Sequence, residues 1–404
     1  MNEMNISQAS AVLNKIVQQA TGQATIANIQ SPEDFVAVAQ TALKTGYDPV
    51  INAISQIWSR TIFANRPYNA KFRSLEMSLP RYGNAVRKLS PIARQMSDDQ
   101  RFKWPVAYDA VGHADNALGN GESVDMYKIN KQDVLQTNFY GTAVYEQDFT
   151  IFKDQFDVAF SSADEFGRFN SMCMLERQND KESFIENVGR GLQANFIAAI
   201  LDEKQNTRII HLLTEYNTES GSQLTAQTVK QPENFAPFMR WAYARIASIA
   251  RLFSDRSQMF QTVINGKPVL RHTDAENLRL CMLSSAAEQM KAMVNSVTYH
   301  DDYLRYANLE YVNFWQDIET PDSVAIQPVY TDNTGAVKKA DAEVEQAGIF
   351  AVMHDRDALG YAVTNSWSAV TPLNIHGGYW NEAYHANIKT ISDVTEKAVV
   401  FILD

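Results

Sequence analysis

The longest helical pattern in the chain covers residues 161–204. Apolar residues recur there at intervals of three and four, as they do along one face of an α-helix. The residues at these intervals are Phe166, Phe169, Cys173, Phe184, Val188, Leu192, Phe196, Ala199 and Ile200. Asp164 and Glu165 suit the positive end of such a helix, and no proline interrupts it. About forty residues at 1.5 Å each give a rod of roughly 60 Å. The pattern therefore predicts a spine helix with other elements along both of its sides.

Three glycines weaken this helical pattern. Gly167, Gly189 and Gly191 each cost about 1 kcal/mol relative to alanine in a helix interior. Because two of them are so close, we expect a bend or break near residues 189–191. The alternative interpretation of the whole stretch is two ordinary helices of a globular core.

The first 62 residues show short amphipathic patterns. Ser31 precedes Pro32, which is a typical helix start, and Gly46 is a typical stop. The apolar faces of these short helices are small. We therefore expect residues 1–62 to form a helical N-terminal arm that needs a partner surface, in this chain or in another copy.

The helical period is lost over residues 63–150, and the charge changes sign along this stretch. Residues 60–103 carry ten basic and three acidic residues, whereas residues 104–150 carry seven acidic and two basic ones. Alternating apolar positions predict strands at 75–79 and 134–145. This pattern favours a long two-stranded excursion whose first strand is basic and whose returning strand is acidic. We expect this excursion to dock on a neighbouring subunit. The alternatives are a solvated hairpin or a nucleic-acid-binding segment, but interleaved apolar residues and the acidic return favour protein pairing.

The charges of this excursion are our candidates for contacts between subunits. They are Arg81, Arg87, Lys88, Arg94, Arg101, Lys103, Asp109, Asp115, Glu122 and Asp125. If they fix how the arm docks, reversing Arg87 and Lys88 to glutamate leaves the monomer folded and blocks assembly.

Residues 205–404 mix both periods. Helices are predicted at 235–253 and 284–297, and a hairpin at 261–271 around Asn265-Gly266. Strands are predicted at 278–283, 309–315, 324–330, 349–353, 379–390 and 398–403. The second half is therefore expected to be an α+β domain around a mostly antiparallel sheet.

Composition narrows the function. The 404 residues carry a net charge of −11, which does not suit a protein that wraps nucleic acid. The two cysteines, Cys173 and Cys281, form no CxxC pair, so we expect free buried thiols rather than a zinc or redox motif. The N-terminus lacks the pattern of a signal peptide, and no run of about eighteen apolar residues suggests a membrane span.

The sequence contains no convincing motif of a known enzyme class. The chain lacks a P-loop, a dinucleotide fingerprint, HExxH and GxSxG. His376 and His385 are more typical of strand or loop residues than of a metal pair, and His354-Asp355-Arg356-Asp357 is expected to be a turn between strands. We therefore predict no catalytic residue, metal or cofactor, with an enzyme of unrecognised type as the remote alternative.

The order of these parts resembles the HK97 fold of tailed-phage major capsid proteins. The segment IFAVMHDRDAL at 349–359 resembles a strand and turn of that family, and GGYWNEAYH at 377–385 is similar to a segment of phi29-type podovirus head proteins. The resemblance implies four parts: a helical arm (1–62), an extended loop with its base (63–150), a peripheral domain with the spine helix (151–204), and an axial domain (205–404) whose terminal strands return to the peripheral domain.

The resemblance also implies a function. Many copies in pentamers and hexamers would form an icosahedral virion shell, made in the host cytoplasm, around weakly contacted double-stranded DNA, with portal, scaffold and head-tail proteins as partners. The alternative with this fold is an encapsulin-like cellular compartment. Some such shells crosslink through lysine and asparagine. Lys128 and Lys131 lie near the expected loop, and Asn374 and Asn381 near the end of the chain, but we expect no crosslink.

Overall fold

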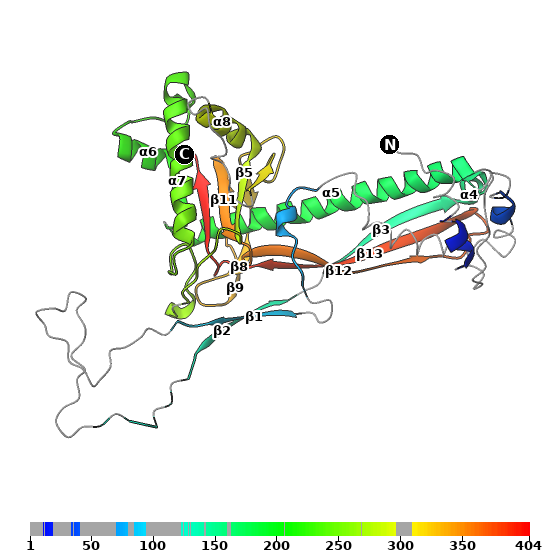
Figure 1. Cartoon of the computed structure of the whole chain (residues 1–404), viewed down its shortest axis with the longest axis horizontal. Helices are drawn as coiled ribbons and strands as arrows, with labels where there is room; N and C mark the ends of the chain where they lie inside the picture. The colour runs from blue at the N-terminus through cyan, green and yellow to red at the C-terminus, as the bar shows by residue number, and fades with distance from the viewer. Residues whose placement is uncertain are drawn as a thin grey trace, which may run out of the picture.

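A single long helix runs through most of the length of the molecule (Figure 1). The computed structural model describes residues 70–79, 85–93, 131–140, 143–159, 163–205, 207–267, 269–295 and 309–404, with residues 11, 13–18, 34, 36–40, 123, 125–127 and 129. The long helix is α5 (Ala163–Glu203), of 41 residues. Residues 11, 13–18, 34 and 36–40 are helical, and Leu13, Ile16 and Ala39 are buried, as expected of an N-terminal helical region.

The expected break near residues 189–191 is wrong, because α5 is continuous there. Gly189 is buried against Phe72, and a Cβ at position 189 would lie 2.8 Å from the Cβ of Phe72. Gly191, in contrast, is exposed and would have no atom within 4 Å of an added Cβ. The first glycine therefore serves close packing against the preceding segment, and the helix tolerates both because tertiary contacts outweigh propensity.

A three-stranded antiparallel sheet lies along α5 (Figure 1). Its order is β12 (Leu359–Val370), β13 (Tyr379–Ser392) and β3 (Ala143–Phe152). Tyr145 of β3 packs edge-on against Phe184 of α5, with ring centroids 4.4 Å apart. A short helix, α4 (Lys153–Ala159), connects β3 toward the start of α5. The helix and this sheet form one elongated layer pair.

A second sheet of five strands stands at one end of α5, with α7 beside it (Figure 1). Its order is β4 (Ile209–His211), β14 (Ala398–Ile402), β11 (Ile349–Asp355), β5 (Leu278–Leu283) and β6 (Leu309–Val312). The inner pairs β14–β11 and β11–β5 are antiparallel, whereas the outer pairs with β4 and β6 are parallel. The sheet is therefore mixed, and the expected strands at 278–283, 349–353 and 398–403 form its centre.

The centre of this sheet is buried on both faces. Every residue of β11 and β14 is buried, which explains why both read as continuous apolar runs rather than alternating ones. The helices α6 (Leu212–Ser220), α7 (Pro232–Phe253) and α8 (Ser284–Asn295) accompany it. The inner side of α7 supplies Phe238, Ala242, Ile246, Ile249 and Phe253 to the same core.

Several expected strands and turns differ in the structure. The predicted strand at 324–330 is two short strands, β7 (Val324–Ile326) and β8 (Val329–Thr331), which pair with β10 (Val344–Gln346) and β9 (Val337–Lys339). The predicted strand at 309–315 ends at Val312.

The predicted hairpin around Asn265-Gly266 is wrong. These residues form a 3-10 turn, Ile264–Gly266, in which Asn265 and Gly266 both have positive φ. The turn is bonded to a different loop, because the Asn265 amide donates to Asn333 O (2.9 Å).

The strand predicted at 75–79 is also wrong. The chain there forms the 3-10 turn Arg73–Leu75, followed by a single bridge between Glu76 and Tyr361. Phe72, just before this turn, has a left-handed backbone (φ 60°) and is fully buried against α5. This segment is therefore a wedge between the spine helix and β12, since the Met77 amide also donates to Tyr361 O (2.9 Å).

Candidate assembly surface

The main described part of the two-stranded excursion predicted over residues 63–150 is a two-stranded ribbon. Its strands, β1 (Ala85–Pro91) and β2 (Val134–Tyr140), pair antiparallel along their full length. The stretch 134–145, predicted as one strand, thus belongs to two sheets, β2 in the ribbon and β3 along the spine. Figure 1 shows the ribbon below the two sheets.

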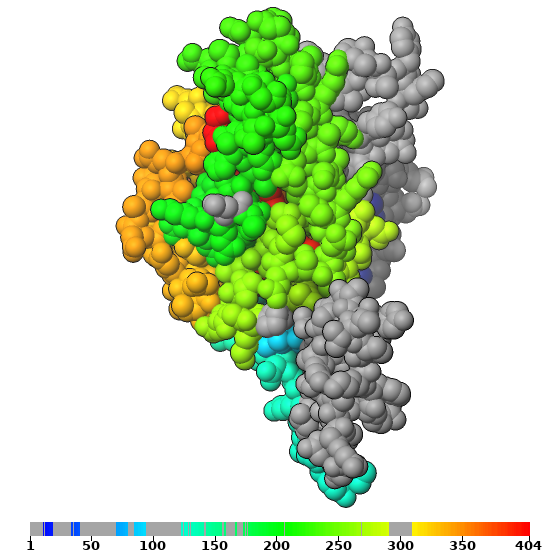
Figure 2. Space-filling view, turned by 90° about the vertical axis from the view of Figure 1, so that its left-hand side faces the viewer, coloured from blue at the N-terminus to red at the C-terminus, as the bar shows by residue number. Residues whose placement is uncertain are grey.

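The two faces of the ribbon differ. Alternate residues of β1 and β2 are partly buried or buried and face the body of the chain: Val86, Lys88, Ser90, Leu135, Thr137 and Phe139. The residues between them are exposed, and we call them the outward face: Ala85, Arg87, Leu89, Pro91, Val134, Gln136, Asn138 and Tyr140. In Figure 2 the ribbon, in cyan, lies below the green surface of the helical region.

The outward face is unusually apolar for an exposed surface. Leu89 is 58% exposed, Val134 51% and Tyr140 75%. Arg87 lies among them, opposite Asn138. An exposed apolar patch with a single flanking charge is typical of a protein–protein contact.

The structure places three of the predicted contact residues. Arg87 is on the outward face, Lys88 faces the body, and Asp125 is exposed, with its Oδ1 accepting a hydrogen bond from the Tyr127 amide (2.9 Å). The other candidates lie outside the described residues: Arg81, Arg94, Arg101, Lys103, Asp109, Asp115 and Glu122. In the ribbon, Arg87 and Lys88 lie opposite the neutral residues Asn138 and Thr137, so the described pairs of β1 and β2 do not show the predicted basic-to-acidic pairing.

Lys88 inserts into a buried ionic cluster on the body. Its Nζ donates to Asp393 Oδ2 (2.9 Å) and to Asp357 O (3.3 Å), and it forms an ion pair with Glu396. Arg271 forms a second ion pair with Glu396. The side chains of Asp393 and Glu396 are only 2% and 8% exposed, so these charges are largely removed from water.

The electrostatics of this cluster keep Lys88 charged. Burial lowers the pKa of Lys88, but the charges of Asp393 and Glu396 outweigh it and raise that pKa above its usual value. Burial also acts to raise the pKa of Asp393, yet the charge of Lys88 holds it below its usual value. In Glu396 burial wins, so its pKa is raised. At neutral pH Lys88 and Asp393 therefore stand as an ion pair.

The cluster lies where the two sheets join. Residues 393–397 connect β13 of the spine-side sheet to β14 of the five-stranded sheet, and all five are buried. We call this segment the joint. Its Lys397 donates to Phe253 O (3.1 Å) and Asp255 O (2.5 Å) at the end of α7, where basic groups suit the helix dipole. Burial lowers the pKa of that lysine.

The predicted core of the spine helix is largely in place. Phe166, Cys173 and Phe196 are buried, while Phe184, Val188 and Leu192 are partly buried. The side chain of Phe169 lies outside the described residues. The helix is also fixed by polar contacts that the apolar pattern does not reveal, above all Arg177, which donates to both carboxylate oxygens of Glu382 in β13 (2.8 and 2.7 Å).

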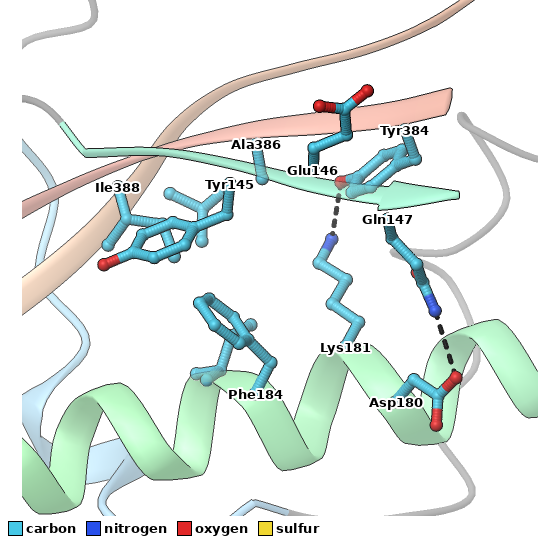
Figure 3. Close-up of a pocket in the computed structure, with 11 residues that line it drawn as sticks. Tyr145, Glu146, Gln147, Asp180, Lys181, Phe184, Tyr384, Ala386 and Ile388 are labelled. Carbon is cyan, nitrogen blue, oxygen red and sulfur yellow. Dashed lines mark hydrogen bonds between the residues drawn. The ribbon is translucent and has the colours of Figure 1, made fainter. Parts of the chain in front are cut away.

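A groove of about 280 Å³ lies between α5 and the three-stranded sheet (Figure 3). Tyr145, Phe184 and Ile388 are among the apolar side chains that line it. At its rim Lys181 donates to Tyr384 Oη (3.1 Å), and Gln147 donates to Asp180 (3.0 Å). The groove thus has an apolar floor and polar rim groups that are bonded to one another.

The sheet ends in a stiff turn remote from the joint. Between β12 and β13, the Asn374 side chain accepts hydrogen bonds from the amides of His376 and Gly377 (both 3.0 Å). Gly378 has a positive φ, which suits glycine. This turn holds Ile375 with 83% of its surface exposed. The far end of the spine thus exposes one large apolar side chain.

The described part of the chain contains no group of three or more His, Cys, Asp or Glu side chains arranged to hold a metal ion. Nor does any described helix have the length and hydropathy needed to cross a membrane. Cys173 and Cys281 are both buried free thiols, as expected.

Sequence reasoning missed the partners of Lys88. Asp393 and Glu396 follow the ribbon by about three hundred positions, and Arg271 was assigned to a hairpin that does not exist. The one available signal was the polar run DVTEK at 393–397 directly before the buried strand β14, which marks a connection but not its partner. Arg177 and Glu382 were missed in the same way.

Comparisons with known proteins agree with this architecture. The family model of the Phi29-like phage major capsid protein matches residues 13–402. The capsid structure of Staphylococcus phage Andhra has a TM-score of 0.53 at 9% sequence identity and covers 85% of this chain and 86% of that chain. The capsid structure of cyanophage P-SCSP1u has a TM-score of 0.44 at 10% identity, covering 85% and 92%. No curated protein sequence matches the chain.

The family match spans nearly the whole chain, and the Andhra capsid shares its α+β fold. It also decides between the two kinds of shell left open by the sequence, in favour of the phage. The chain therefore belongs to the Phi29-like phage major capsid protein family, with the HK97-like capsid fold, and is a shell protein of the virion.

Proposed function

We propose that copies of this chain assemble as pentamers and hexamers into a closed icosahedral shell around double-stranded phage DNA. The observation that carries this proposal is the outward face of the ribbon, which exposes Leu89, Val134 and Tyr140 on the side turned away from its own chain. A shell protein is surrounded by other copies of itself, so we assign this face to a neighbouring copy. Closure follows when such head-to-tail contacts repeat around an axis.

The proposed parts follow the order inferred from the sequence. Residues 1–62 form an arm, 63–150 the extended loop, 151–204 the peripheral domain, and 205–404 the axial domain with strands that return along the spine. The pairing of β13 with β3 supports that return, since it joins residues 379–388 to residues 143–152. It also suggests that the peripheral part begins at β3, a few residues before position 151.

Charge supports a container rather than a DNA-binding wall. With a net charge of −11, the chain as a whole repels phosphate, so packaged DNA would be held weakly and without sequence specificity. Portal, scaffold and head-tail proteins are further proposed partners, and synthesis in the host cytoplasm is part of the same proposal. We propose no catalytic role, because the groove along the spine is apolar and its rim groups are bonded to each other.

Electron microscopy and sedimentation of the purified chain test the proposal. We expect closed shells or rings of five and six copies from the wild-type chain, with scaffold protein added where the chain alone does not close. The variant Leu89→Ser/Tyr140→Ser should keep the melting temperature of the unassembled chain, because both side chains are already exposed, and should lose the shells.

The matched control is Val337→Ser, which removes an equally exposed apolar side chain from the β8–β9 hairpin. We expect shells from this control. Wild-type yields of shells from Leu89→Ser/Tyr140→Ser would contradict the assigned contact, and a chain that stays monomeric with scaffold present would contradict the assembly proposal itself.

A further inference from the structure

Three parts of the molecule meet at one buried cluster of charges. The ribbon contributes Lys88, the joint contributes Asp393 and Glu396, and the segment that follows α7 contributes Arg271. We propose that Lys88 is a positioning residue: by docking in the joint, it sets the direction in which the ribbon presents its outward face to the next copy. This inference rests on the proposed function and deepens it, because it says what aims the contact surface.

The position of Lys88 on the ribbon supports this role. It is the central residue of β1, and it faces the body while its neighbours Arg87 and Leu89 face outward. A two-stranded ribbon on its own is marginally stable in water, so its direction depends on what it docks against. Lys88 makes that contact with three oxygens on the body, those of Asp393, Glu396 and Asp357.

A second, weaker contact lies one step along the same face. Arg271 Nη2 donates to Ser90 Oγ at 3.4 Å, and the same nitrogen donates to Thr395 Oγ1 at 3.0 Å. Two inward residues of β1, at positions 88 and 90, thus touch the same cluster. Two points of attachment along a strand define a direction, whereas one would leave the ribbon free to pivot.

The joint itself is rigid, so it can transmit a direction. Asp393 Oδ1 accepts bonds from the amide and hydroxyl of Thr395 (2.9 and 2.6 Å). The Asp393 amide donates to Ala358 O (2.7 Å), and the Thr262 amide donates to Val394 O (3.2 Å). The joint is therefore held at Ala358, between β11 and β12, and at Thr262, and it is continuous with β13 and β14. A ribbon attached to the joint is thus positioned relative to both sheets.

The ionic character of the cluster also explains why the attachment is specific. The carboxylates are buried, so they bind a cation far better than a neutral side chain, and an apolar residue at position 88 would leave them short of one partner. A guanidinium at that position would keep the charge and could bond both carboxylates.

Hydrogen exchange on the unassembled chain tests the inference directly. We expect Lys88→Met to speed amide exchange in β1 and β2 at least tenfold, while exchange in β11 and α7 stays at the wild-type rate. Arg87→Met is the matched control, since it removes a cation from the adjacent, outward position and should leave ribbon exchange unchanged. Lys88→Arg should restore slow exchange in the ribbon, because it restores the cation. If Lys88→Met acted only by lowering the stability of the whole chain, this recovery would not be expected.

The same variants are then tested for assembly by sedimentation and microscopy. We expect Lys88→Met to give open or irregular aggregates, and Lys88→Arg to give closed shells. Equal exchange in Lys88→Met and Arg87→Met would overturn the positioning role, and so would regular shells from a Lys88→Met chain with a loosened ribbon. A wild-type chain that never assembles would contradict the proposed function instead, while the exchange comparison would still decide the role of Lys88.

Discussion

Two glycines on the spine helix, two positions apart, have opposite surroundings. Gly189 faces the wedge residue Phe72, whose backbone adopts a left-handed conformation to reach it, whereas Gly191 faces solvent. Glycine lowers helix stability at both positions to the same extent. Packing therefore decides which of the two is needed.

Replacing each glycine by alanine should give effects of opposite sign. In Gly189→Ala the new Cβ would lie 2.8 Å from the Cβ of Phe72, and we expect a loss of about 1–3 kcal/mol in the free energy of unfolding, as for overpacked cores. Gly191→Ala should gain up to about 1 kcal/mol. Urea unfolding of the unassembled chain measures both. Equal effects at the two sites would mean that Phe72 does not fix the position of this wedge.

A buried histidine makes the stability of the chain depend on pH. His354, in the middle of the five-stranded sheet, is fully buried, and its Nδ1 lies 2.8 Å from Asp355 O. Burial, which disfavours the charged imidazolium, lowers its pKa to about 4. The unfolded chain takes up this proton near pH 6.5, so stability is complete above that pH and is lost as the pH falls toward 4.

The variant His354→Gln tests this pH dependence. The shift corresponds to about 3 kcal/mol between pH 7 and pH 4, at about 1.4 kcal/mol per pH unit. The wild-type chain should lose that much more stability than the variant over this range, as measured by unfolding at a series of pH values. Parallel curves for the two proteins would show that burial does not lower the pKa of His354 in the folded chain.

Among the elements, a buried ion pair contributes to the attachment of the spine helix to its sheet. Arg177 and Glu382 form a bidentate pair, and the Arg177 guanidinium also lies 4.4 Å from the Phe149 ring centroid on the next strand. Their side chains are 6% and 1% exposed. Breaking such a pair from one side is costly because a charge remains buried, whereas replacing both partners is often tolerated.

A double-mutant cycle on this pair should therefore be strongly non-additive. We expect Arg177→Met to cost about 3–5 kcal/mol of unfolding free energy, Glu382→Gln a comparable amount, and the double variant much less than their sum. The single variants at a partly exposed pair, Arg245→Met and Glu215→Gln, serve as controls and should each cost about 1 kcal/mol or less. Additive losses at 177 and 382 would mean that the two charges act independently.

The elements that can be predicted well from the sequence are those with either one buried face or both faces buried. The spine shows the period of one buried face, and β11 and β14 show the continuous apolar runs of strands buried on both sides. β1 was missed because its alternation is inverted: Leu89 points to solvent and Lys88 points inward. A ribbon that exposes its apolar residues and carries a charged residue on its inner side gives a misleading pattern to any argument based on hydrophobic alternation.

For the whole molecule, much of the order of helices and strands could be inferred from the sequence, but the place where the ribbon and the two sheets meet could not. Lys88 and Asp393 are 305 positions apart, and nothing local to either of them indicates the other. The same is true of Arg177 and Glu382, which are 205 positions apart. Charged contacts of this kind depend on the arrangement of the sheets, so they become visible only once the fold is known.

The net charge of the whole chain predicts how assembly responds to salt. Each copy carries −11, so copies repel one another at long range, and salt shortens that range from about 30 Å at 0.01 M to about 8 Å at 0.15 M. We expect the lowest concentration at which shells form, measured by light scattering, to fall as salt rises over this interval. A threshold that rises instead would mean that attraction between opposite charges, such as Arg87 and an acidic neighbour, dominates assembly.

The joint and the far turn stand at opposite ends of a lever. A helix of 41 residues at 1.5 Å each spans about 60 Å, so an error of one degree at the joint moves the remote end by roughly 1 Å. A gap of 0.5–1 Å already forfeits about a quarter to a half of a van der Waals contact. If Ile375 contacts a neighbouring copy in the proposed shell, that contact keeps its fit only if the joint holds its angle to within about a degree. The many hydrogen bonds of residues 393–397 therefore limit how far the angle between the two sheets can vary.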